Sequence, residues 1–237
     1  EIYCEWAPNE KVALESAFGA CLAGKRAFCG MKHVGLNVAA DPLYTCSYTG
    51  VNAGLVIGVA DDPAMHSSQN EQDSRHHAIA SKIPMIEPSN SQEAKDFMKI
   101  AFDISEKFDT PVLFKTVTRV AHSQSIVELC DRIEPEVKQY NKDISKYVMA
   151  PANAIKRHPF VEQRLKDIEK WSETSGINKI EISNSDKKFG IITSSTCYQY
   201  TKEVFGDSVS ILKIGMTNPL PANMIKDFAE KVEDIYV

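Results

Sequence analysis

Short apolar runs recur along the first 120 residues and predict the strands of a sheet. The longest unbroken run, G-L-V-I-G-V-A at residues 54–60, is typical of a parallel strand that is buried on both faces. Three other runs rich in apolar or β-branched residues predict further strands, at residues 26–31, 84–87 and 110–120.

Amphipathic stretches between these runs predict helices. Residues 91–107 carry apolar side chains at helical spacing, and Asn90 with Glu93 forms a capping pair at their start. A helix rich in small residues is expected from Glu10 onward, and a mixed one over residues 36–48, with a proline near its start or at a kink. Because strands and helices alternate, we expect an α/β fold with a doubly wound, mostly parallel sheet.

The pattern changes after residue 122. Residues 123–185 are charged, contain three prolines, and are expected to form a partly helical connecting segment, with a helix at 160–171. The alternation then returns, with strands expected at 189–193, 209–214 and from 235 onward, and helices at 196–205 and 221–232. We therefore expect a first α/β domain over residues 1–122 and a second, smaller α/β domain over 186–237.

Composition narrows the class of protein. The formal net charge of −5 over 237 residues argues against a nucleic-acid or anionic-membrane partner, because neither would meet a basic field. No apolar run is long enough to predict a transmembrane helix. The six cysteines are scattered and never form C-x-x-C, so they give no iron–sulfur or zinc signature and favour a reduced, cytoplasmic protein.

The helix that begins near Glu10 has a candidate chemical group at its start. At helical spacing Glu10 shares a face with Leu14, Ala17 and Cys21, and small residues on the adjoining face let another backbone approach. A carboxylate in line with that apolar stripe would be desolvated, which favours its protonated, hydrogen-bond-donating form. The alternative is an ordinary first-turn acid that complements the helix dipole behind an Asn9 cap.

Polar residues follow several predicted strands, whose carboxyl ends line the ligand crevice in doubly wound folds. Lys32 and His33 are suited to hold an anionic substrate or to shuttle a proton, and Arg119 to pair with a carboxylate. The polar stretch over residues 61–73 is typical of a binding loop, with His66, Ser67, Gln69, Asn70 and Asp73 as its candidate residues. Solvated surface side chains, or a structural ion pair for Arg119, are the alternatives.

Metal binding has little support in this loop. The adjacent carboxylates Asp61 and Asp62 offer oxygen ligands of the kind that magnesium prefers, but real sites gather ligands from several segments. We therefore assign no metal ligand. The chain also has no glycine-rich phosphate loop and no acyl-transfer signature, so these patterns alone predict an α/β protein with a polar loop edge.

Longer runs of sequence are more specific. They are E-W-A-P-N-E-K-V-A-L-E-S-A-F-G-A, M-K-H-V-G-L-N-V-A-A-D-P, D-D-P-A-M-H-S-S-Q-N-E-Q-D, I-E-P-S-N-S-Q-E-A-K-D and K-I-G-M-T-N-P-L-P. Through these runs the chain resembles, over nearly its whole length, the α subunits of indolepyruvate:ferredoxin oxidoreductases, within the thiamine diphosphate-dependent 2-oxo acid:ferredoxin oxidoreductases.

The resemblance implies an enzyme that decarboxylates an aryl 2-oxo acid oxidatively, passes electrons through iron–sulfur clusters to ferredoxin, and forms an aryl-acyl-CoA. It implies a β subunit, ferredoxin, coenzyme A and the oxo acid as partners. The first domain would be the pyrimidine-binding domain of such enzymes, and the second a transketolase C-terminal-like domain. Glu10 falls at the position of the family's glutamate that hydrogen-bonds N1′ of the aminopyrimidine, and Lys32, His33, Arg119 and the polar loop would face cofactor or substrate.

Parts of the family pattern are missing from the chain. The first strand, the diphosphate-binding domain with its magnesium motif, and the cysteine-rich iron–sulfur segment are not present, so we expect an internal fragment that is inactive alone. The diphosphate, Mg²⁺ and iron–sulfur sites would then lie outside it. Two alternatives are a sibling enzyme acting on pyruvate or a branched-chain 2-oxo acid, and a non-catalytic α/β module that contributes a subunit interface.

Overall fold

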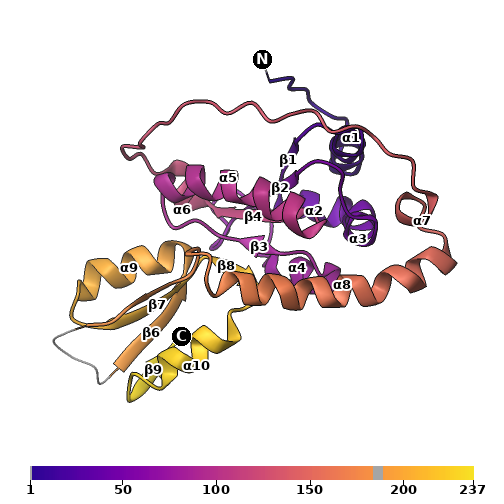
Figure 1. Cartoon of the computed structure of the whole chain (residues 1–237). Helices are drawn as coiled ribbons and strands as arrows, with labels where there is room; N and C mark the ends of the chain where they lie inside the picture. The colour runs from indigo at the N-terminus through magenta and orange to yellow at the C-terminus, as the bar shows by residue number, and fades with distance from the viewer. Residues whose placement is uncertain (1, 184–188) are drawn as a thin grey trace.

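The computed structural model of the chain describes residues 2–183 and 189–237, and its strands form two sheets (Figure 1). Within these residues the first sheet contains, in order across it, β1 (Ala27–Lys32), β2 (Leu55–Asp61), β4 (Val112–Val117), β3 (Met85–Ile86) and β8 (Met216–Asn218). β1, β2, β4 and β3 run parallel, and β8 pairs antiparallel with β3 at the edge. The expected mostly parallel α/β sheet is therefore confirmed.

Helices cover both faces of this sheet, as a doubly wound fold requires. The helices of this part are α1 (Glu10–Leu22), α2 (His33–Val38), α3 (Ala40–Thr49), α4 (Arg75–Ser81), α5 (Ser91–Phe108) and α6 (Thr118–His122). On one face Leu14 of α1 and Leu43 of α3 enter a core with the strands. On the other face Phe97 of α5 and Ile168 of α8 (Pro151–Ser172) form a second core.

The second sheet is smaller, and its strands alternate along the C-terminal part of the chain with β8, a strand of the first sheet. Its described strands are, in order, β5 (Lys179–Glu181), β7 (Ser210–Ile214), β6 (Phe189–Ser194) and β9 (Asp234–Tyr236), packed with α9 (Ser195–Phe205) and α10 (Ala222–Ala229). β5 lies in the segment expected to be a connection, whereas β8, from the second unit, completes the first sheet. The expected boundary at residues 185 and 186 lies outside the described residues.

Two elements predicted for residues 1–122 differ clearly from those observed. The strand expected over 110–120 ends at Val117, and the chain continues as α6. The helix expected over 36–48 is two helices that meet at Ala39, because α2 begins directly after β1 and α3 then takes a new direction. Pro42 lies in the first turn of α3, where its missing N–H leaves no helical hydrogen bond unmade.

Helix α5 begins as its sequence predicts. The side chain of Asn90 accepts a hydrogen bond from the backbone N of Glu93 at 2.9 Å, which confirms the cap. The carboxylate of Glu93 turns back to the backbone N of Ser89, also at 2.9 Å. These bonds fix the corner between β3 and α5, where the second unit makes contact.

The connecting segment is an extended strap (residues 123–143) followed by α7 (Ile144–Tyr147) and the long helix α8 (Figure 1). The helix expected at 160–171 begins earlier, at Pro151, because a proline suits the first helical position. The strap is held at Gly24, whose O accepts from the N of Lys138 at 3.0 Å. Gly24 has φ +96°, and a Cβ there would lie 1.7 Å from the carbonyl O of Lys138, so only glycine fits.

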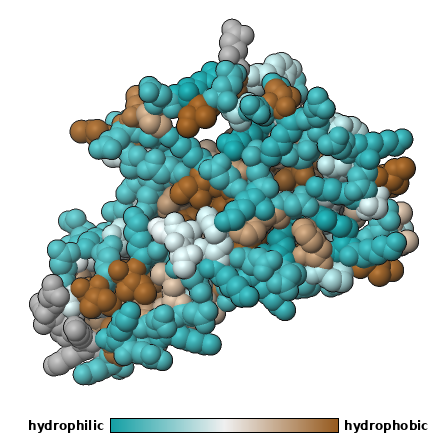
Figure 2. Space-filling view, in the orientation of Figure 1, coloured by the Kyte–Doolittle hydropathy of each residue, from teal (hydrophilic) through white to brown (hydrophobic). Residues whose placement is uncertain are grey.

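The visible surface is largely hydrophilic, with separate hydrophobic patches (Figure 2). Several apolar side chains of the strap stand in solvent, namely Ile126, Leu129 and Ile133. Among the described residues, no helix combines the length and the apolar character needed to cross a membrane.

Candidate functional site

The topology gathers the candidate residues at one edge of the first sheet. β1, β2 and β4 are parallel, so Lys32, Asp61 and Thr118 all lie at or just beyond their carboxyl ends. Helix α1 precedes β1 and packs on it, so that its first turn returns to the same edge. Glu10 in that turn packs against Gly35 of α2, which begins where β1 ends. We call this region the carboxyl edge.

Glu10 is a half-buried carboxylate with unused hydrogen-bonding capacity. Asn9 caps α1 by accepting from the N of Val12 at 3.0 Å, and Leu14 and Cys21 on the face of Glu10 are buried. A Cβ on Gly35 would lie 2.5 Å from Cγ of Glu10 and 2.8 Å from its Oε1. Among the described residues, no hydrogen bond or ion pair involves this carboxylate. Glu10 is thus both a first-turn acid and a group able to receive an external partner.

Two buried side chains belong to β1 and the residue after it: Cys29 lies in the middle of the strand, and His33 begins α2. Burial raises the pKa of the Cys29 thiol to about 11, and the negative charge of nearby Glu10 adds to the effect. His33 is only 1% exposed, and within the described part of the chain neither of its ring nitrogens has a hydrogen-bond partner. Both nitrogens are shielded from solvent, so His33 lies buried beneath the surface of the carboxyl edge. A ligand-binding role for it stays a prediction.

The polar loop, residues 62–74, is organised by Asp62. This carboxylate is buried and accepts hydrogen bonds from Ser68 Oγ (2.6 Å), Ser67 N (2.8 Å), Thr118 Oγ1 (2.8 Å) and His66 N (3.1 Å). The bond from Ser68, followed by the others, holds the pKa of Asp62 well below its ordinary value. Asp62 therefore acts as an internal acceptor that folds the loop.

Several predicted binding residues already contact other groups of the protein. Lys32 Nζ donates to the carbonyl O of Ser67 at 2.8 Å, so the structure brings these two candidates together. Asp73 accepts from the backbone N of Arg75 at 2.9 Å and pairs with its guanidinium at 3.2 Å. Asn70 accepts from the side chain of Gln72 at 2.8 Å. These contacts shape the loop.

Three candidates remain open to a ligand. The side chains of His66, Gln69 and Arg119 are exposed, and none has a hydrogen-bond or ion-pair partner in the part of the chain that the structure describes. Over the same residues, no group of three or more His, Cys, Asp or Glu side chains is arranged to hold a metal ion. Within the described residues, the carboxyl edge thus presents the carboxylate of Glu10, the guanidinium of Arg119 and the polar side chains of His66 and Gln69 without a protein partner.

A buried ionic cluster around Glu87 was not predicted from the sequence. Glu87, the residue after β3, is fully buried and contacts Arg75 of α4, Lys115 of β4 and Thr217 of β8. A signal was available, because the run P-M-I-E ends an apolar strand with a carboxylate. The sequence around Arg75 gave no such signal, because α4 is short and follows a polar stretch.

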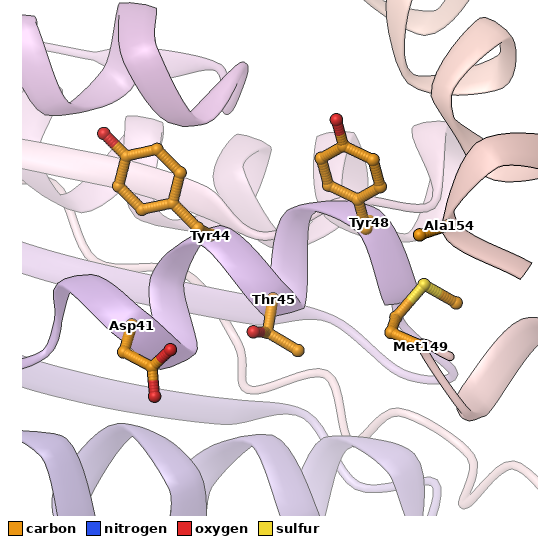
Figure 3. Close-up of a pocket in the computed structure, with 6 residues that line it drawn as sticks. All are labelled: Asp41, Tyr44, Thr45, Tyr48, Met149 and Ala154. Atoms are coloured by element: carbon orange, nitrogen blue, oxygen red, sulfur yellow. The ribbon is translucent and has the colours of Figure 1, made fainter. Parts of the chain in front are cut away.

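A separate groove of about 270 Å³ lies between α3 and the start of α8. Figure 3 shows Tyr44 and Tyr48 projecting from α3 on the same side, with Met149 and Ala154 across from them. The carboxylate of Asp41 at this groove is paired with Lys11 at 3.1 Å. None of the predicted site residues lines the groove, so we do not place the candidate site there.

Comparisons with known proteins identify relatives of the chain. The chain is 42% identical over its whole length to the indolepyruvate oxidoreductase subunit IorA of Archaeoglobus fulgidus, and 40% to that of Methanothermobacter thermautotrophicus. It spans 38% and 39% of the length of these two relatives.

Solved structures show the same fold at low identity. A 2-oxoglutarate:ferredoxin oxidoreductase from Magnetococcus marinus matches 97% of this chain and 48% of its own, with a TM-score of 0.73 and 13% identity. An inactive tetramer of a split-gene transketolase matches 96% of this chain and 61% of its own, with a TM-score of 0.53 and 11% identity. The family described as pyruvate flavodoxin/ferredoxin oxidoreductase, thiamine diphosphate-binding, matches residues 4–182. Because this match covers most of the chain, the chain belongs to that thiamine diphosphate-binding family.

Proposed function

We propose that the chain is part of a subunit of a thiamine diphosphate-dependent oxidoreductase that decarboxylates an aryl 2-oxo acid of the indolepyruvate type. The products would be an aryl-acyl-CoA and reduced ferredoxin. The family match and the names of the relatives support this proposal. Since the chain spans under two-fifths of those relatives, the rest of the protein and a β subunit would supply the remaining sites. We place the enzyme in the cytoplasm, where its cysteines stay reduced.

The observation that carries the proposal is the unpartnered carboxylate of Glu10. Because no group of the described residues occupies the oxygens of this half-buried carboxylate, they are free to form a hydrogen bond with a ring nitrogen of a bound cofactor. The absence of a side chain at Gly35 leaves room for Glu10 at the carboxyl edge. The residues present therefore fit the pyrimidine end of thiamine diphosphate, with Glu10 as the catalytic residue.

The diphosphate end needs other residues. The described part of the chain has no metal-binding group of side chains. We therefore assign the diphosphate, its Mg²⁺ and the iron–sulfur clusters to protein outside this chain. This division agrees with the share of the relatives that the chain covers.

When bound, thiamine diphosphate would supply the carbon nucleophile that this chemistry needs at the keto carbon of the substrate. Glu10 shares a proton with N1′ of the aminopyrimidine, the role of a general acid–base group. Arg119 is a cation suited to the substrate carboxylate, with His66 and Gln69 as hydrogen-bonding groups. Lys32 holds the loop through Ser67.

The test is Glu10→Gln in the full-length subunit assembled with its partner, with Glu15→Gln as the matched control. Glu15 is on the same helix but exposed, 3.9 Å from Lys11. Because Gln removes the carboxyl that shares the proton, we expect kcat of the Glu10 variant to fall about 10²- to 10⁴-fold. The control should keep its kcat, and titration with thiamine diphosphate should show that both variants bind cofactor.

Other outcomes would change the proposal. Unchanged turnover with weakened assembly in the Glu10 variant would favour a non-catalytic interface module. The substrate is tested separately, by comparing kcat/KM for indolepyruvate and pyruvate in the unmodified enzyme. A higher value for pyruvate would replace the aryl acid by a sibling substrate.

A further inference from the structure

The Glu87 cluster, defined as Glu87, Arg75, Lys115 and Thr217, is saturated with hydrogen bonds. Oε1 of Glu87 accepts from Arg75 Nε at 2.6 Å and from Thr217 Oγ1 at 2.6 Å. Oε2 accepts from Arg75 Nη2 at 2.8 Å and from Lys115 Nζ at 3.0 Å. One buried carboxylate thus joins α4, β4 and β8.

Opposite charges keep this cluster ionised. Burial alone would raise the pKa of Glu87, but Lys115 and Arg75 outweigh it and lower the pKa below its ordinary value. Burial likewise opposes the charge of Arg75, but its hydrogen bonds to Glu87 raise the pKa of the guanidinium. Each charge therefore depends on the others staying in place.

On one side the cluster holds the end of the polar loop. Arg75 also pairs with Asp73 through its backbone N and its guanidinium. Lys115 lies 3.8 Å from Asp61, whose carboxylate accepts from the N of Ser74 at 3.0 Å and from its Oγ at 2.5 Å. Most of the loop between Asp62 and Ser74 is exposed, so the buried contacts at its Ser74 end add to those of Asp62 and Lys32 in fixing its conformation.

On the other side the cluster contacts the second unit. Thr217 belongs to β8, which Figure 1 shows between β3 and the second sheet. The backbone N of Glu87 donates to the O of Gly215 at 2.8 Å. Arg75 Nη2 also reaches Oγ of Ser194, at the end of β6, at 3.4 Å. A displacement of the second unit would therefore remove partners of buried charges.

We propose that Arg75 and Glu87 are positioning residues through which the second unit sets the conformation of the polar loop, and so the access of the 2-oxo acid to the carboxyl edge. The access part rests on the function proposed above. The coupling part rests only on the contacts of the cluster. Neither residue needs to touch the substrate, because the loop that each supports carries His66 and Gln69.

The test removes one of the contacts that the second unit makes with the cluster, the hydrogen bond from Thr217. In the full-length subunit with its partner, Thr217→Val deletes the hydroxyl donor to Glu87, and Thr193→Val is the matched control. Thr193 is in β6, half-buried, and its side chain has no partner within the described residues. Hydrogen exchange followed by mass spectrometry measures the exchange rates of the backbone amides in residues 62–74. Steady-state kinetics give KM and kcat for indolepyruvate. Arg75→Lys, which cannot reproduce the two-nitrogen contact with Glu87, is a second variant.

We expect Thr217→Val to speed exchange in residues 62–74 about fivefold, the effect of one lost hydrogen bond, and to raise KM more than kcat falls. Thr193→Val should change neither. Equal loop exchange in the two threonine variants would overturn the coupling, and faster exchange with an unchanged KM would overturn the role in access. Exchange needs no turnover, so it decides the coupling even if the unmodified enzyme proves inactive on 2-oxo acids and the proposed function fails.

Discussion

Two carboxylates at the carboxyl edge of the first sheet have opposite surroundings. Glu10 is half-buried and, in the described structure, has no hydrogen-bond or ion-pair partner. Glu87 is fully buried and accepts four hydrogen bonds from Arg75, Lys115 and Thr217. The same chemical group, on neighbouring parts of one sheet, is left open in one place and fully used in the other.

The difference separates a group available for chemistry from a group that maintains structure. A carboxylate whose acceptor sites are filled has little left to offer a ligand, whereas an unpartnered one gains by meeting a ligand. A strongly perturbed buried charge is thus not by itself a mark of a catalytic residue, since structural ion networks perturb pKa values as well. Here the open carboxylate is the better functional candidate.

The largest expected effect tests stability. Glu87→Ala leaves Arg75 and Lys115 without their buried counter-charge, so we expect the free energy of unfolding to fall by about 3–5 kcal/mol. Glu10→Ala removes no hydrogen bond within the described residues and should cost about 0.5 kcal/mol or less. Urea unfolding followed by the fluorescence of Trp171, which packs near the second core, measures both. Equal losses would remove the distinction between the two carboxylates.

The second prediction tests whether the position of Glu10 matters. In Gly35→Ala the new methyl group would lie 2.5 Å from Cγ of Glu10, and the flexible Glu10 side chain must turn away. We expect turnover of the assembled enzyme to fall about 100-fold, because a catalytic group is displaced. Gly19→Ala is the control, since a Cβ there meets nothing within 4 Å. Full turnover in the Gly35 variant would contradict the role of Glu10.

The third prediction concerns the stability of the protein at low pH. The pKa of Glu87 is lower in the folded protein than its ordinary value, so its charge contributes stability that is present above that ordinary value, about 4.3, and is lost as pH falls below it. Unfolding free energy measured from pH 6 downward should therefore decline less steeply in Glu87→Gln than in the unmodified protein. Parallel pH profiles would show that Glu87 keeps an ordinary pKa.

The smallest expected effect is on the reactivity of Cys29, which senses the charge of Glu10. Burial is the main cause of the raised pKa of Cys29, and Glu10 is the lesser one. Glu10→Gln should therefore speed alkylation of the Cys29 thiol at pH 9 only about two- to threefold. Mass spectrometry after iodoacetamide treatment measures the rate, and exposed Cys4 serves as the reference within the same chain. A decrease in the rate would contradict the electrostatic contact.

Periodicity and apolar runs were sufficient to predict most strands of the first sheet and helix α5, because those segments bury one face or both. They failed for α4 and β5, which are short, and for the helix over 36–48, which tertiary packing divides at Ala39. Glu10 was predicted as a functional residue from its helical stripe and the family resemblance, and that role stays a prediction. Lys32 and Ser67 were each predicted to bind a ligand, but their contact with each other follows only from the packing of the loop.

The sequence by itself determined the alternation of strands and helices, the family, and the position of Glu10 in the first turn of α1. These properties depend on local spacing and on long runs of residue identity, both of which can be read along the chain. Only the tertiary structure decided which carboxylates have partners, because the partners of Glu87 come from residues 12, 28 and 130 positions away. Such contacts are set by how the sheets and helices pack, and no local pattern records them.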